Sequence, residues 1–170
     1  MKKLIFVTVL ILLGNFTTRA QDPTPSNDCD PSLWNYVYTP SRFGKTRPVH
    51  RCVTVKGRIT KVWPRGKESD GDIHLSINPD NMSLPKGQTS LVVEIICAER
   101  PTKGAAIDSC ARFHRDGKGH PLALGRTRLN SLVGKHVIIT GELVIDYGHP
   151  TKYGYHIREL HPVTKINRIN

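Results

Sequence analysis

Four side chains of types that bind metals or transfer protons form two pairs in the sequence. Asp72 and His74 make the first pair, and Glu159 and His161 make the second. Residues two apart in an extended strand point to the same face, so each pair presents a carboxylate beside an imidazole. If the two pairs converge, a divalent metal becomes reasonable, because imidazole suits zinc or copper and carboxylate adds negative charge. The alternative is a hydrogen-bonded polar cluster at one end of the fold.

Five apolar segments must position these pairs. Three of them alternate apolar and polar residues, which is the period of a half-buried strand, and the last is interrupted by Pro162. The segment 91–97 is instead almost entirely apolar apart from Glu94, which predicts a central strand. Helical periodicity is weak throughout, and the best helix candidate is a short turn at 126–133. The five predicted strands cover residues 53–62, 72–77, 91–97, 137–145 and 155–166.

Two glycines indicate how these strands are arranged. Gly57 and Gly141 each lie on the apolar face in mid-strand, where a missing side chain lets a strand bend or bulge. A small barrel needs such bends to close. With its long connection between the third and fourth strands, the chain resembles the OB-fold, a five-stranded Greek-key barrel. We therefore predict an all-β, OB-like barrel over residues 51–166, with a long loop or short helix in that connection; the alternative is a β-sandwich fragment.

A second resemblance concerns the segment 57–62 and the sequence Asp70-Gly71-Asp72-Ile73. They are similar to the start of the staphylococcal-nuclease family, itself a family of secreted OB barrels. The resemblance implies that Asp72 helps to hold calcium. The third predicted strand lacks the arginine of the family pattern, and an insertion before Asp70 changes the spacing. Without that arginine, phosphodiester cleavage loses its main electrostatic stabiliser.

The first twenty residues have the pattern of a secretory signal peptide. A head with Lys2 and Lys3 precedes an apolar run over 4–13, and Thr18-Arg19-Ala20 supplies small residues for cleavage after Ala20. No apolar run is long enough to span a bilayer as a helix. We therefore expect a signal peptide at 1–20, a partly disordered N-terminal arm at 21–50, and a secreted or periplasmic location.

Export favours disulfide bonds between the cysteines, because an oxidising compartment stabilises them. The chain has four cysteines, and no two of them have the C-x-x-C spacing of zinc ribbons or thioredoxins. Four cysteines allow three connectivities. We favour Cys29–Cys52 and Cys97–Cys110, since each pair brackets one irregular segment beside a predicted strand.

The aromatic residues Trp34, Tyr36 and Tyr38 alternate along the N-terminal arm. In an extended segment they share one face. The first interpretation is a strand or arm that covers the edge of the core, and the second is a stacking platform for bases or sugars.

Positive charge is concentrated in residues 100–135, which we call the basic segment. It holds eight Lys and Arg against two Asp, whereas the whole chain has 25 basic and 14 acidic residues. Such a segment attracts polyanions by counterion release. The alternative is a solvated surface that keeps the protein soluble. The candidate ligand-binding cations, which include two from the first predicted strand, are Lys56, Arg58, Arg112, Arg115, Lys118, Arg126 and Arg128.

These observations leave three functions open. The composition excludes collagens, coiled coils and fully disordered chains, and the sequence contains no Walker, Rossmann, G-x-S-x-G or H-E-x-x-H motif. The first prediction is a binding module without a cofactor, whose partner is nucleic acid or an anionic polysaccharide. The second is a metal-dependent hydrolase or nuclease at Asp72, His74, Glu159 and His161. The third is a structural or interaction protein of the cell envelope.

Overall fold

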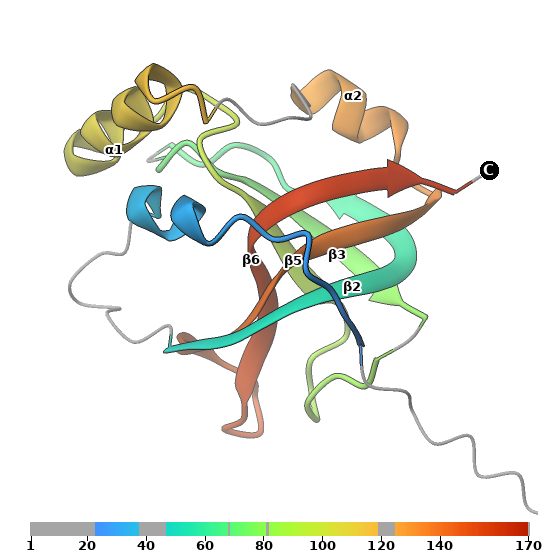
Figure 1. Ribbon diagram of the computed structural model, residues 1–170. Helices are drawn as coiled ribbons and strands as arrows, with labels where there is room; N and C mark the ends of the chain where they lie inside the picture. The colour runs from blue at the N-terminus through green and yellow to red at the C-terminus, as the bar shows by residue number, and fades with distance from the viewer. Residues whose placement is uncertain (1–22, 38–46, 68, 81, 119–124, 170) are drawn as a thin grey trace, which may run out of the picture.

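The computed structural model describes residues 23–37, 47–67, 69–80, 82–118 and 125–169 (Figure 1). The predicted signal peptide and Tyr38 lie outside these ranges. The strands are β1 (Thr24–Pro25), β2 (Arg47–Val62), β3 (Ile73–Pro79), β4 (Leu91–Ile95), β5 (His136–Pro150) and β6 (His156–Arg168). The helices are a 3₁₀ helix η1 (Pro31–Tyr36) and the α-helices α1 (Gly104–Arg115) and α2 (Arg126–Ser131).

The five long strands form a closed barrel. Their order is β2-β3-β4-β6-β5, and β5 pairs back onto β2 to complete the circle. All neighbouring strands in the barrel are antiparallel except β4 and β6, which are parallel. This arrangement confirms the predicted five-stranded barrel and is compatible with an OB-like fold. It also places the third and fifth barrel strands side by side.

The apolar faces of the strands fill the barrel. Val55, Leu75, Val93 and Leu160 are fully buried in one core cluster, which the alternating pattern predicts. Gly57 is required because a Cβ there would lie 2.4 Å from the carbonyl oxygen of Asn78, so any other side chain would push β2 away from β3. The absence of a side chain at Gly57 thus permits the close approach of β2 and β3.

Helices occupy the long connection between β4 and β5. The predicted turn at 126–133 is α2, and the longer helix α1 precedes it. Ala106, Cys110 and Phe113 are buried at helical spacing along α1, and Cys110 and Phe113 pack in one cluster with residues of η1. Both α-helices lie at the same end of the barrel in Figure 1. The sequence pattern of α1 is weak because only these few positions and Ser109 are buried.

The aromatic part of the N-terminal arm is not extended, which corrects the prediction made for Trp34 and Tyr36. Residues 31–36 form η1, since the Asp30 side chain accepts a hydrogen bond from Ser32 N at 2.9 Å and Pro31 starts the helix. The two rings therefore do not share a face: Tyr36 packs on Phe113, whereas Trp34 packs on His161.

Two disulfide bonds attach peripheral segments to the barrel. Cys29–Cys52 joins the arm to β2, and Cys97–Cys110 joins the end of β4 to α1. The favoured connectivity is thus confirmed, and it fits a protein of an oxidising compartment. Among the described residues, no helix is long and apolar enough to cross a membrane.

Candidate metal centre

The parallel pair of β4 and β6 brings two polar side chains together on the outside of the barrel. Val93 is registered with Leu160, and both point into the core. The next residue on each strand, Glu94 on β4 and His161 on β6, therefore lies on the outer face. The alternation of each strand thus sets a carboxylate beside an imidazole, although 67 positions separate them in the sequence.

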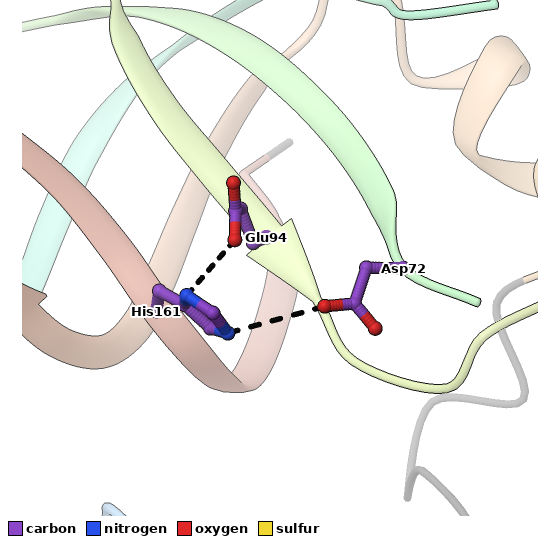
Figure 2. A group of neighbouring side chains, drawn as sticks. All are labelled: Asp72, Glu94 and His161. Atoms are coloured by element: carbon purple, nitrogen blue, oxygen red, sulfur yellow. Dashed lines mark ion pairs between the residues drawn. The ribbon is translucent and has the colours of Figure 1, made fainter. Parts of the chain in front are cut away.

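Asp72 completes the group from the turn that leads into β3. Figure 2 shows the His161 ring between the carboxylates of Asp72 and Glu94. Nδ1 of His161 lies 2.9 Å from Glu94 Oε2, and Nε2 lies 3.9 Å from Asp72 Oδ2. One donor atom from each residue lies within 4.8 Å of the other two. We call Asp72, Glu94 and His161 the buried cluster.

The Nε2 atom of His161 is the unsatisfied group of the buried cluster. It is buried and has no hydrogen-bond partner among the described residues, because its separation from Asp72 exceeds hydrogen-bond length. The His161 side chain is only 9% exposed and that of Asp72 only 8%. A buried polar atom without a partner is destabilising by about 1–3 kcal/mol, so its presence needs an explanation.

The other atoms of the buried cluster are held by specific contacts. Asp72 Oδ1 accepts a hydrogen bond from the backbone N–H of Cys97 at 2.9 Å, next to the Cys97–Cys110 disulfide. Glu94 Oε1 lies 3.3 Å from Nε2 of His74. The Trp34 ring of η1 packs over His161, with ring centroids 5.9 Å apart. The cluster is therefore contacted by the backbone of Cys97 and by His74, and the N-terminal arm covers it from one side.

Burial and mutual charge shift the protonation of the buried cluster. Burial raises the pKa of Asp72 to about 8, against the pull of the positive charge of His161. Burial alone would lower the pKa of His161, but the charge of Glu94 and the hydrogen bond to it raise that pKa to about 9. Burial likewise acts to raise the pKa of Glu94, but His161 outweighs it and the pKa falls. Protons on Asp72 and His161 thus balance the charges of the buried cluster at neutral pH.

Two of the four predicted metal ligands meet in the structure, and the other two are directed elsewhere. Asp72 and His161 face each other across the 3.9 Å gap. His74 reaches Glu94 rather than the gap. Glu159 hydrogen-bonds to Asp146, and burial together with the charges of Glu94 and Asp146 raises its pKa. Asp146 also contacts Nδ1 of His149, so Glu159 belongs to a neighbouring polar network.

Glu94 was not among the predicted ligands, although the sequence contains a signal for it. It is the one charged residue in a strand whose other residues are apolar, and such a residue needs a partner when the strand is central. Its position beside His161 follows from the parallel pairing of β4 and β6, which the sequence pattern does not specify. Trp34 was considered as part of an arm that covers the core or as a stacking platform, and its contact with His161 depends on η1.

Several of the candidate polyanion-binding cations contact acceptors of the chain itself. Arg126 forms two hydrogen bonds with Glu99, at 2.6 and 2.9 Å, and Lys118 pairs with Asp30 at 3.0 Å. Arg58 and Arg112 donate to backbone carbonyls at 3.0 and 3.4 Å. The exposed members of the set are Lys56, Arg58, Arg112, Arg115 and Arg128. Polyanion binding by these cations stays a prediction.

The chain was also compared with known proteins. No family model, curated protein or solved structure matches it.

Proposed function

We propose that this protein binds a divalent metal ion of the zinc type through Asp72 and His161. The observation that carries the proposal is the buried Nε2 of His161, which lacks a hydrogen-bond partner among the described residues and lies 3.9 Å from Asp72 Oδ2. Zinc bonds to imidazole nitrogen and carboxylate oxygen are about 2.0–2.2 Å long, so one ion spans such a gap. Tetrahedral ligands lie about 3.4 Å apart, and a shift of the Asp72 carboxylate by about half an ångström reaches that distance.

Glu94 supports the site as a positioning residue. Its two oxygens already contact Nδ1 of His161 and Nε2 of His74. The bond to Nδ1 keeps the proton on that nitrogen and leaves the lone pair of Nε2 directed at the gap. Carboxylate–histidine–metal arrangements use such a contact to fix the ring and raise its basicity. In this proposal a metal ion replaces the protons on Asp72 and on Nε2 of His161.

The burial of the site favours binding over hydrolysis of a polymer. The ligand side chains are less than a tenth exposed, and Trp34 packs on the His161 ring. A catalytic metal needs an open position that the substrate can reach. The imidazole also favours zinc over calcium, which prefers oxygen ligands. The nuclease interpretation is therefore the weaker alternative, and a purely structural role of the buried cluster remains the competing one.

Calorimetric titration of the full chain with zinc chloride tests the proposal. We expect the wild-type protein to bind one zinc ion per chain. Relative to wild type, Asp72→Asn and His161→Asn should each lower the affinity for zinc by about 100-fold or more, and Glu94→Gln should lower it by about 10-fold. His136→Asn is the matched control, because His136 also pairs with a carboxylate, Asp80, at 3.6 Å but at an exposed place.

The variants also separate the proposal from surface binding of zinc by other histidines. If His161→Asn binds zinc as tightly as the wild type, the site is elsewhere and the proposal is wrong. A purely structural cluster would bind no zinc at all, and the same variants would then change only the free energy of unfolding. Fluorescence of Trp34 in a Trp63→Phe background should change on zinc binding, since its ring lies 5.9 Å from that of His161.

A further inference from the structure

A surface groove of about 510 Å³ lies between the 82–90 loop and the β5–β6 hairpin. The turn of that hairpin and the loop project at the end of the barrel opposite to α1 and α2 (Figure 1). The residues that line the groove include none of the buried cluster and none of the two α-helices. The polar and aromatic residues that line it are Ser83, Lys86, Tyr147, Tyr155, His156 and Arg158.

Both walls of this hairpin groove are fixed by contacts within the chain. Gln88 binds the backbone of β6 twice: its Oε1 accepts from Arg158 N at 2.8 Å, and its Nε2 donates to Arg158 O at 2.6 Å. At Gly87, which has a φ of +91°, a Cβ would lie 2.7 Å from the Tyr153 ring. The loop therefore packs directly onto the hairpin, and little ordering remains for a ligand to induce.

The lining of the hairpin groove combines aromatic faces, hydroxyl groups and positive charge. Tyr147 and Tyr155 are 40% and 52% exposed, so their rings are accessible from solvent. Lys86 and Arg158 supply two cations, and no acidic residue is among the described residues that line the groove. A ligand that fits carries negative charge and a flat, partly apolar face.

We propose that the hairpin groove binds acidic sugar residues of a glycan. A sugar ring packs its C–H face on a tyrosine, while its hydroxyls bond to Ser83, His156 and the tyrosine hydroxyls. Its carboxylate pairs with Arg158 or Lys86. The four hydroxyl and imidazole side chains outnumber the lysine and the arginine, which favours a ligand with many hydroxyls and few charges. A polynucleotide has a charge on every residue and suits a groove with more cations.

Titration with a galacturonic acid tetramer tests this inference, and two lysines make a matched pair. Lys86 and Lys152 lie 4.8 and 5.0 Å from the centre of the Tyr153 ring, but only Lys86 lines the groove. We expect Lys86→Gln and Tyr155→Ala each to weaken binding by about tenfold and Lys152→Gln by less than about twofold. A neutral galactose tetramer should bind at least about tenfold more weakly than the acidic one.

Three results would overturn the inference. They are a wild-type protein that does not bind the acidic tetramer, tighter binding of a short oligothymidylate than of the tetramer, and an equal effect of Lys86→Gln and Lys152→Gln. Because the groove shares no lining residue with the buried cluster, a chelator should leave glycan binding unchanged. Failure of the metal proposal and failure of the glycan proposal are therefore distinguishable.

Discussion

The buried cluster and the basic segment differ in the burial and in the hydrogen-bond partners of their charged side chains. In the buried cluster, His161 lies between two carboxylates away from water, and its Nε2 is left without a hydrogen bond among the described residues. In the basic segment, Arg126 is held by both oxygens of Glu99, and Arg115 remains in solvent. A buried polar atom left unsatisfied therefore points to a site more strongly than a high density of charge does.

The difference predicts that stability depends far more on the buried cluster than on the basic segment. In zinc-free protein, His161→Leu should lower the free energy of unfolding by roughly 3–5 kcal/mol, since it removes the closer of the two imidazoles that contact the buried Glu94 carboxylate and leaves only His74. Urea denaturation with a chelator present measures this loss. The double variant His161→Leu with Glu94→Gln should recover part of it, and no recovery would show that the cost comes from packing alone.

The largest effect within the basic segment should come from Arg126. Its two bonds to Glu99 and its contact with the carbonyl of Trp63 join α2 to two loops. Arg126→Gln should lower the free energy of unfolding by about 2 kcal/mol, because hydrogen bonds to charged groups are lost. Arg128→Gln, on the same helix but exposed, should stay within about 0.5 kcal/mol of wild type. Equal losses of stability in the two variants would contradict the role of Arg126 in joining α2 to the two loops.

The ion pair between Arg126 and Glu99 should also change how the stability of the protein depends on pH. Arg126 holds the pKa of Glu99 below its ordinary value of 4.5. A lowered pKa in the folded state stabilises the protein above the unfolded value, and this stability is lost as the pH falls below about 4.5. Unfolding midpoints measured between neutral pH and about pH 3 should therefore fall less steeply in Arg126→Gln than in wild type. Parallel curves would show that the pair contributes nothing.

The smallest effect should come from the exposed end of α1. Arg115 lies 3.8 Å from Asp116, and the two side chains are 69% and 44% exposed. Exposed ion pairs of this kind contribute about 0–1 kcal/mol. Arg115→Ala should therefore change the free energy of unfolding by less than about 0.5 kcal/mol in thermal or chemical denaturation. A larger loss would mean that the surface of this segment is more constrained than its exposure suggests.

The sequence predicted the barrel well because the strands are specified by patterns of residues that are close together in the sequence. The apolar patterns predicted the five barrel strands, and the positions of the cysteines relative to those strands predicted the two disulfides; both predictions are confirmed. The candidate site was less predictable, since Asp72 meets His161 only through long-range contacts. The partners Glu94 and Trp34 depend on the parallel pairing of β4 with β6 and on η1. Side chains on one face of a strand are predictable, whereas the neighbour across the sheet is not.

The pairing of β4 with β6 has a final consequence for the motions of the molecule. Only two residue pairs register along it, Val92 with Glu159 and Val93 with Leu160, which is the shortest ladder in the described barrel. The contact between Glu94 and His161 begins where this backbone ladder stops. We expect the barrel to open locally first at this junction. A cation bound by His161 would stabilise the junction against such opening. The rate of amide hydrogen exchange at Val93 and Leu160 would then be lower with the cation bound than without it.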